Sequence, residues 1–340
     1  MPPFIPVEFS TRDRILRATG EKVEIRFVLV DATVAADQIA DKHGARGFAR
    51  QLIGEAAAAA LLLASGLKWP GTVQMRFSLS GDINKLAADA TPLGLVRAMI
   101  PKEELERTGS FEPMVLPRSL TVRKLDREGR VLSEGVVEMV SPEISASLMH
   151  YLEQSEQTKS LARVAAVCDE SGERLLFCGG FLLEAFPGVR DEDWIPVMHI
   201  AESLDFGSFI RTAKAKGEAK NEAIEEPQET GGLDLARIFA ALTAPFPAQV
   251  HQEFGVEPYC PCSEKGVLQA LTGLGREELE VMYLGGEDVE VFCEFCRKRY
   301  VVPAERLKEL LEEVEEVEGA PEADDPDGKE EEGGALPEDL

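Results

Sequence analysis

Two short stretches near the end of the chain decide how its C-terminal part folds: CPCS at residues 260–263 and CEFC at residues 293–296. The first carries a C-x-C pair and the second a C-x-x-C pair. Two such pairs in one small module can bring four thiolates to one ion, and zinc accepts four sulfurs in tetrahedral geometry. Thiolate ligands also exclude the hard cations magnesium and calcium. The pattern therefore predicts a zinc site with four ligands: Cys260, Cys262, Cys293 and Cys296.

The residues around the two pairs favour a compact module over about 256–305. Gly273-Leu274-Gly275 separates two short helical pieces, and Val289 to Phe292 leads into the second pair as a strand. Arg297-Lys298-Arg299 follows directly, and nearby cations favour the thiolate form of cysteine. A solvated basic patch is an equally good interpretation of these three residues.

The other two cysteines, Cys168 and Cys178, predict packing rather than chemistry. They lie on two expected strands whose turn is centred between Ser171 and Gly172, so Cys168 should face Leu175 rather than Cys178. We therefore expect two buried core cysteines and no disulfide between them.

The start of the chain has no basic segment followed by an apolar one, and three of its first six residues are proline. This argues against a signal peptide. The longest apolar run, Ala56–Ala64, is far shorter than the ~18 residues that span a bilayer. We expect no membrane contact and a cytoplasmic location, where clustered cysteines indicate metal ligands or redox groups.

The chain has 340 residues, room for two domains, and a net charge of -26 from 36 basic and 62 acidic residues. Half of that charge lies in residues 311–340, which hold fourteen acidic residues and one lysine. This composition predicts a disordered acidic tail. So acidic a chain is also a poor partner for the phosphates of nucleic acid.

Residues 8–188 predict a mixed α+β core domain with a mainly antiparallel sheet. Alternating apolar residues predict half-buried strands over Val23–Leu29 and Val73–Leu79, and helices are expected at Thr33–His43 and Phe48–Leu67. A further helix should begin at Pro142. The other expected strands are Leu95–Ile100, Leu120–Leu125, Val131–Met139, Leu161–Cys168 and Leu175–Phe186.

Residues 189–255 predict a helical linker between the core and the cysteine module. Val189–Lys216 has apolar residues at helical spacing, Gly217–Gly232 is polar, and Leu233–Leu242 is a short amphipathic helix. The predicted architecture is thus a core, a linker, a small zinc domain and a tail.

Several motifs together resemble the Hsp33 family of redox-regulated chaperones, over about residues 10–310. The cysteine stretches are the most specific, and Tyr300 follows them at the family's position. The matching segments are DRILRA (13–18), YLEQSEQ (151–157), CGGFL (178–182), FPG (186–188), CPCS (260–263), GREEL (275–279) and VFCEFC (291–296). The tail from Leu311 and the long charged stretch 211–232 depart from the family pattern.

The resemblance implies an ATP-independent holdase that is zinc-bound and inactive when reduced, and is not an enzyme. Oxidants would convert Cys260–Cys262 and Cys293–Cys296 to disulfides, with loss of zinc. The linker would then loosen, and the oxidised protein, a homodimer in this family, would bind unfolded clients. Thiol reductants would reverse the change.

Two other function classes remain open at this point. A zinc-ribbon module that binds nucleic acid needs a basic face, for which 297–299 is the candidate. A thiol-disulfide oxidoreductase needs Cys293 and Cys296 at the start of a helix, whereas the residues after them read as extended. The four histidines are scattered and are interpreted as surface or core residues, with His251 a weak competing ligand: His43, His150, His199 and His251.

Overall fold

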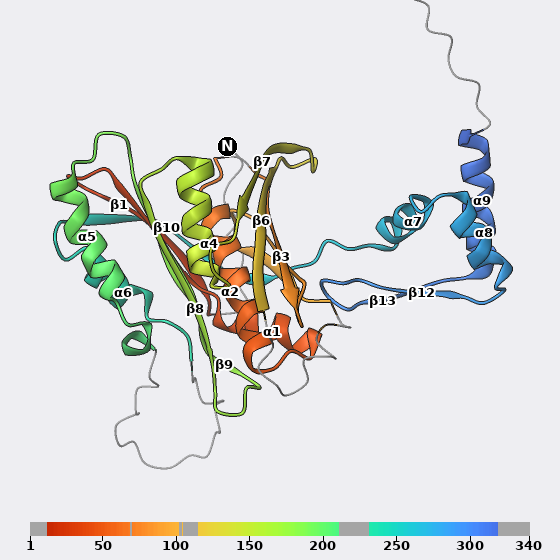
Figure 1. The fold of residues 1–340 in the computed structure, drawn as a ribbon, viewed down its shortest axis with the longest axis horizontal. Coiled ribbons are helices and arrows are strands. Elements are labelled where there is room, and N and C mark those ends of the chain that lie inside the picture. Colours follow the sequence, from red (N-terminus) through yellow and green to blue (C-terminus); the bar gives the residue numbers. More distant parts are fainter. Residues whose placement is uncertain (1–11, 69, 102–103, 105–114, 211–230, 319–340) are drawn as a thin grey trace, which may run out of the picture. The chain divides into compact units, whose positions relative to one another are not determined.

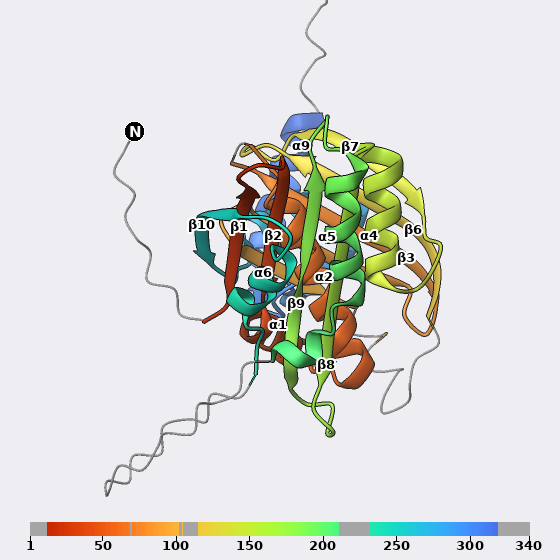
Figure 2. The ribbon, with the colours of Figure 1, turned by 90° about the vertical axis from the view of Figure 1, so that its left-hand side faces the viewer.

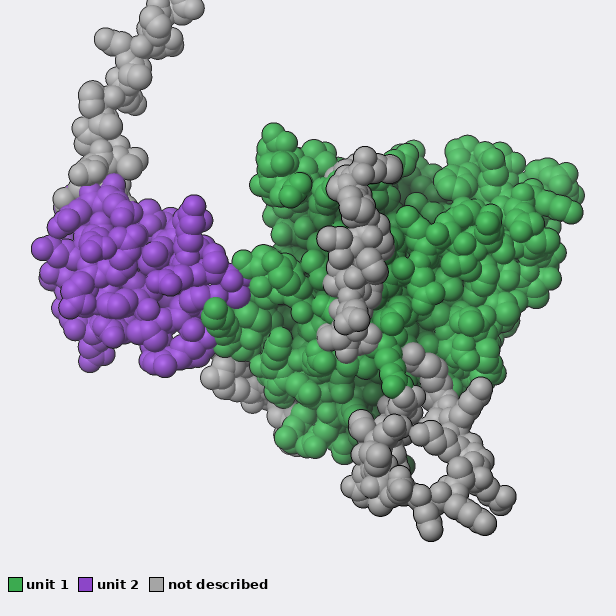
Figure 3. Space-filling model, turned by 180° about the vertical axis from the view of Figure 1, so that it is seen from behind, with its two compact units in different colours: residues 1–261, 293–298 green, residues 262–292, 299–340 purple. Residues whose placement is uncertain are grey.

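The computed structural model describes residues 12–68, 70–101, 104, 115–210 and 231–318. The chain divides into two compact units (Figure 3). The first unit runs to Pro261 and includes Cys293–Lys298, and the second unit comprises Cys262–Phe292 and the chain from Arg299 onward. Most of the predicted polar stretch and the end of the predicted tail, residues 319–340, lie outside the described residues.

The first unit is built on two sheets, which confirms the expected α+β class. All neighbouring strands pair antiparallel except β11 and β5, which are parallel. The first sheet has the order β10 (Ala248–Gly255), β1 (Arg14–Gly20), β2 (Ile25–Asp31), β9 (Leu175–Ala185) and β8 (Ser160–Cys168). The second has the order β11 (Glu257–Pro258), β5 (Leu95–Met99), β4 (Lys85–Ala90), β3 (Thr72–Gly81), β6 (Val115–Leu125) and β7 (Val131–Glu138).

Helices lie between the two sheets and on the outer face of the five-stranded one. The inner layer is α1 (Thr33–His43), α2 (Gly47–Ala64) and α4 (Ile144–Tyr151). The outer layer is α5 (Asp191–Ser203) and α6 (Leu235–Leu242), in front of β1, β2, β8 and β9 in Figure 2. The helix expected at Thr33–His43 is confirmed at both ends.

Strand β2 is buried on both faces, although the sequence predicted a half-buried strand. Val28 and Val30 pack into the cluster around α2, whereas Phe27 and Leu29 join a second cluster. The second cluster includes Trp194 of α5. The prediction was incomplete because α5 and α6, far along the chain, cover the second face.

Helix α2 is the central element of the first unit and contacts strands of both sheets. By length and composition it could cross a membrane, but 78% of it is buried inside the protein. Its alanines and Gly54 let the strands come close, since a Cβ on Gly54 would lie 3.1 Å from Cys178 Sγ. The helix is therefore the packed centre of the core.

Two departures from the predicted linker stand out. Residues 248–255 form β10, which pairs with β1 as an edge strand of the five-stranded sheet, rather than a helical segment. Helix α5 ends at Ser203, and Ile210 and Leu233 then form a β-bridge. The described part of the predicted linker is thus folded onto the core sheet.

As far as Glu318, the last residue that the structure describes, the second unit contains three helices and a two-stranded hairpin. Its elements are α7 (Glu264–Thr272), α8 (Arg276–Leu284), β12 (Val289–Phe292), β13 (Arg299–Val302) and α9 (Ala304–Glu318). Its buried core consists of Leu271, Leu279, Val302, Leu307 and Leu310. The sequence predicted a disordered tail from residue 311. Helix α9 instead extends to Glu318, so residues 311–318 are helical.

Candidate metal centre

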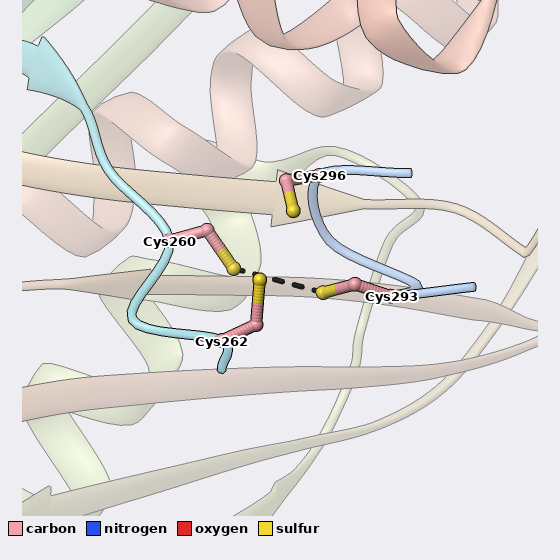
Figure 4. Close-up of side chains that lie close together, drawn as sticks. All are labelled: Cys260, Cys262, Cys293 and Cys296. Carbon is pink, nitrogen blue, oxygen red and sulfur yellow. Dashed lines mark hydrogen bonds between the residues drawn. The ribbon is translucent and has the colours of Figure 1, made fainter. Parts of the chain in front are cut away.

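The four cysteines of the two motifs lie together with their side chains converging (Figure 4). All four sulfurs lie within 4.8 Å of one another, and Cys260 Sγ is 3.6 Å from Cys293 Sγ. Four sulfurs at about 2.3 Å from one tetrahedral ion would be about 3.8 Å apart. All four cysteines are free thiols. The cluster is therefore in a position that could bind a metal ion, and its all-sulfur donor set fits zinc.

A tight turn between β12 and β13 presents the second pair. Cys293 N–H donates to Lys298 O at 3.0 Å, and Arg297 N–H donates to Cys293 O at 2.8 Å. Arg297 closes the turn with a φ of 60°, a left-handed conformation that is uncommon for a residue with a side chain. These backbone bonds place Cys293 and Cys296 on one side of the turn.

Side chains of the first unit hold this turn. His43 Nε2 donates to Phe295 O at 2.9 Å, and Arg297 Nε donates to His43 Nδ1 at 3.2 Å. Arg297 Nη2 also donates to Ile100 O at 3.0 Å. Burial lowers the pKa of His43 to about 4, so at neutral pH the ring is uncharged and can accept one hydrogen bond while donating the other.

The Phe295 ring lies against two arginines of the six-stranded sheet. Its centroid is 4.0 Å from Arg97 Cζ and 5.7 Å from Arg76 Cζ. Both arginines bind the buried carboxylate of Asp89, with Arg97 Nη2 at 2.6 Å. Burial opposes the charge on Arg97, but Asp89 and then Cys260 raise its pKa above the ordinary value.

The first pair is positioned by β11 and by the start of α7. Tyr259 N–H donates to Val96 O at 2.9 Å, which fixes the chain just before Cys260. Ser263 then caps α7 by accepting from Gly266 N–H at 3.2 Å. Cys260 and Cys262 thus lie between two anchored points.

Each thiol of the first pair accepts a hydrogen bond from a side chain. Arg97 Nη1 donates to Cys260 Sγ at 3.5 Å, and Tyr300 Oη donates to Cys262 Sγ at 3.1 Å. A pocket of about 330 Å³ has Arg97 and both chain neighbours of Cys260, Tyr259 and Pro261, in its lining.

Among the described residues, neither of the other cysteines and none of the histidines joins the group of four cysteines. Cys168 pairs with Leu175 across the hairpin, as expected, but it is only partly buried at the edge of the core, where burial raises its pKa to about 11. Full burial raises the pKa of Cys178 well above its ordinary value. His251 lies on β10 beside Thr19 Oγ1 and is not one of the clustered groups.

The two alternative function classes lose their structural basis. Of the basic triplet, Arg297 is bound to His43 and Ile100, and Arg299 forms an ion pair with Glu290. Arg297 is therefore not available to a basic face, and Glu290 offsets the charge of Arg299. An oxidoreductase needs its C-x-x-C pair at the start of a helix. Here the pair occupies the turn of a hairpin.

The sequence predicted the four clustered cysteines but missed Arg97, His43 and Asp89. Arg97 is 163 positions from Cys260, and His43 is 254 positions from Arg297. No local pattern connects such residues. A charged residue between buried Val96 and Ala98 was the one available signal for Arg97.

An α+β core joined to a small module with four clustered cysteines defines a class of two-part proteins with a candidate metal centre. The sequence profile of the Hsp33 protein family matches residues 13–303. The chain belongs to the Hsp33 family.

Individual relatives support this family assignment. The 33 kDa chaperonin of Pelobacter propionicus is 30% identical over 88% of this chain and 94% of its own length. That of Synechococcus elongatus is 29% identical over 89% and 98%. The crystal structure of the 33 kDa chaperonin of Thermotoga maritima has a similar fold, with a TM-score of 0.69, 22% identity, and coverage of 91% of this chain and 100% of that one. Membership in a chaperone family indicates unfolded proteins as the partner class and does not suggest an enzyme.

Proposed function

We propose that this chain is a redox-regulated, ATP-independent holdase of the cytoplasm, inactive when reduced and active when oxidised. Cys260, Cys262, Cys293 and Cys296 hold zinc in the reduced protein. The observation that carries this proposal is the convergence of four free thiols to within 4.8 Å. Zinc bound there supplies a cross-link between two distant stretches of chain.

Oxidation removes that cross-link. In each of the pairs Cys260–Cys262 and Cys293–Cys296, two thiolates give two electrons to one peroxide, which leaves as two hydroxide ions while the S–S bond forms. The bonded sulfurs come to about 2 Å from each other, so they no longer point to a common centre. The chain then releases zinc, and thiol reductants restore the thiols.

Loss of the cross-link unfolds the small module, because zinc-binding free energy is folding free energy in such a domain. We place this redox-switch domain at 256–305, after a core domain at 8–188. The linker 189–255 loosens with it. The oxidised form is a homodimer.

The client surface is the sheet face that the linker covers. Phe27, Leu29 and Phe181 are buried beneath the layer of α5 and α6. If that layer loosens, apolar side chains of the five-stranded sheet become accessible to unfolded chains, which expose apolar surface of their own.

Aggregation of an unfolded client tests the function. Peroxide-oxidised protein should suppress light scattering, and reduced zinc-loaded protein should not. Equal suppression in both states would remove the redox switch, and no suppression in either would remove the chaperone. Hydrogen exchange should rise across the described parts of 189–255 on oxidation; unchanged protection there would reject the linker's role.

Zinc content tests the ligand set separately. Reduced wild-type protein should hold one zinc per chain, and Cys260→Ser should hold it more weakly against a chromogenic chelator. Cys178→Ser is the control, because Cys178 lies outside the cluster. Zinc content and affinity unchanged in Cys260→Ser would contradict the assignment.

A further inference from the structure

The hydrogen bonds to the first cysteine pair differ in charge. Cys262 Sγ accepts from Tyr300, a neutral hydroxyl, at 3.1 Å. Cys260 Sγ accepts from Arg97, a cation, at 3.5 Å. When the sulfur is anionic, the bond from Arg97 also joins opposite charges, which the neutral hydroxyl of Tyr300 does not supply. The two thiols of one redox pair are therefore held differently.

Arg97 is fixed before it meets the sulfur. Its Nε and Nη2 donate to Asp89 Oδ2 at 2.8 and 2.6 Å, and Asp89 is 3% exposed. The ring of Phe295 lies 4.0 Å from its Cζ. These contacts use one edge and one face of the planar guanidinium and direct Nη1 at Cys260.

We propose that Arg97 is a positioning residue of the cysteine cluster that stabilises the anionic sulfur of Cys260 and so sets how readily the Cys260–Cys262 disulfide forms. This rests on the proposed function for its biological meaning. Four thiolates around one divalent cation leave an excess of negative charge, which a neighbouring guanidinium offsets. A sulfur in a disulfide is neutral, and the charged hydrogen bond then has little to stabilise.

The direction of the effect follows. An interaction made in the reduced form and lost in the oxidised form shifts the equilibrium toward the reduced form. Arg97 thus keeps Cys260 reduced against a mild oxidant. Because it stands on β5 and also contacts Phe295, between Cys293 and Cys296, the same side chain links both cysteine pairs to the core sheet.

Arg76 provides a matched control. It binds the other oxygen of Asp89, Oδ1, and its Cζ is 5.7 Å from the Phe295 ring centroid. Its hydrogen bonds go to Asp89 and to the carbonyls of Met75 and Ala88, with none to a sulfur. Arg76→Gln therefore repeats the secondary consequences of Arg97→Gln without touching Cys260.

The experiment measures the redox equilibrium of Cys260 directly. Wild type, Arg97→Gln and Arg76→Gln are equilibrated in glutathione buffers, trapped by alkylation, and the oxidised fraction of the Cys260 peptide is read by mass spectrometry. Arg97→Gln should favour the disulfide by about tenfold, which is about 30 mV for a two-electron couple. Arg76→Gln should stay within twofold of wild type.

A second measurement follows zinc release to a chromogenic chelator after peroxide addition. Arg97→Gln should release zinc several times faster than wild type and Arg76→Gln. If Arg97→Gln does not fold, Arg97→Lys and Arg76→Lys replace the two variants. Lysine lacks the fork that reaches Asp89 and Cys260 together, so Arg97→Lys should again shift toward the disulfide and Arg76→Lys should not.

An equilibrium unchanged in Arg97→Gln, or shifted equally in both variants, would overturn the inference. The mass-spectrometric readout requires neither zinc nor client. A wild-type protein without zinc or holdase activity would therefore refute the proposed function while the Cys260 equilibrium still decides the role of Arg97.

Discussion

The two compact units of this chain are stabilised in different ways. The first packs two extended apolar clusters on either side of a five-stranded sheet, with α2 at the centre of one of them. The second has a single core cluster of five buried apolar side chains among its described residues. A domain this small buries little surface and is marginally stable by burial alone. In the proposed function, zinc held by the cysteine motifs adds the stability that this small core lacks.

The largest difference in stability between the two units should appear when the proposed metal is removed. Structural zinc contributes about 10–16 kcal/mol of apparent free energy in small domains. Cys293→Ser, or a chelator under reducing conditions, should abolish amide protection in α7 and α8. Strands β2 and β9 should remain protected, because their burial does not depend on the cysteines.

Cys178→Ala is the matched control for this comparison, because Cys178 is fully buried in the first unit. It should keep its zinc and lower the melting temperature of the first unit instead. Loss of protection in β2 and β9 on metal removal would show that the two units are stabilised together, and the contrast would fail.

Equal deletions in the two cores should have unequal consequences. Leu279 and Leu62 are both 0% exposed, the first in α8 and the second in α2. Each Leu→Ala change should cost about 2–5 kcal/mol. In the second unit this removes a large share of the core, so Leu279→Ala should speed zinc loss to a chelator. Leu62→Ala should leave zinc retention unchanged; similar zinc loss in both variants would contradict the expectation.

The parts of the fold that could be predicted are those with a local apolar signal. The helix at Thr33–His43 was found at both ends, and Cys168 faces Leu175 as the turn residues indicated. Strand β10 was missed because five consecutive residues, Gln249–Glu253, are exposed and show no alternation. An edge strand held by backbone pairing to β1 leaves little trace in its side chains.

The candidate site likewise has a part that the sequence predicts and a part that it does not. Its sulfur atoms come in closely spaced pairs, and two such pairs in one small module indicate a metal site from the sequence alone. Its supporting side chains, Arg97, Asp89 and His43, become neighbours only when the first unit folds. Their role could be recognised from contacts alone, such as the 2.9 Å bond from His43 Nε2 to Phe295 O.

Glu55 gives a pH test that concerns the first unit alone. Its carboxylate lies on α2 and accepts from Ala166 N–H at 3.4 Å, and burial raises its pKa to about 7. The folded protein therefore binds this proton more tightly than the unfolded chain. The stability it contributes is complete below about pH 4.5 and is lost as pH rises through 7.

Glu55→Gln should remove this dependence. At pH 8 the variant should gain about 3 kcal/mol over wild type in urea unfolding of the first unit, since one pKa unit is worth about 1.4 kcal/mol. At pH 5 the two should be nearly equal. Glu143→Gln is the control, because Glu143 is exposed and adds only a smaller repulsion. A constant difference between wild type and Glu55→Gln at both pH values would reject the burial argument.

The smallest effect should appear where α5 meets the sheet. Arg163 Nη1 on β8 lies within 2.7–3.1 Å of three carbonyl oxygens at the end of that helix, those of Ala201, Glu202 and Leu204. Arg163→Gln should leave these carbonyls without their charged donor, at a cost of about 1–2 kcal/mol. Amide exchange in α5 should rise about 5- to 30-fold, while β2 and β9 stay unchanged.

The matched control is Arg190→Gln, at the other end of α5, where the arginine makes exposed ion pairs with Glu192 and Asp193. Such surface pairs contribute about 0–1 kcal/mol, so exchange should barely change. If Arg163→Gln loosens α5 alone, the first unit itself contains a stable sheet and a separable outer layer. If it destabilises the whole first unit, α5 belongs to the cooperative core, and the layer that the proposed linker needs to loosen would not be separable.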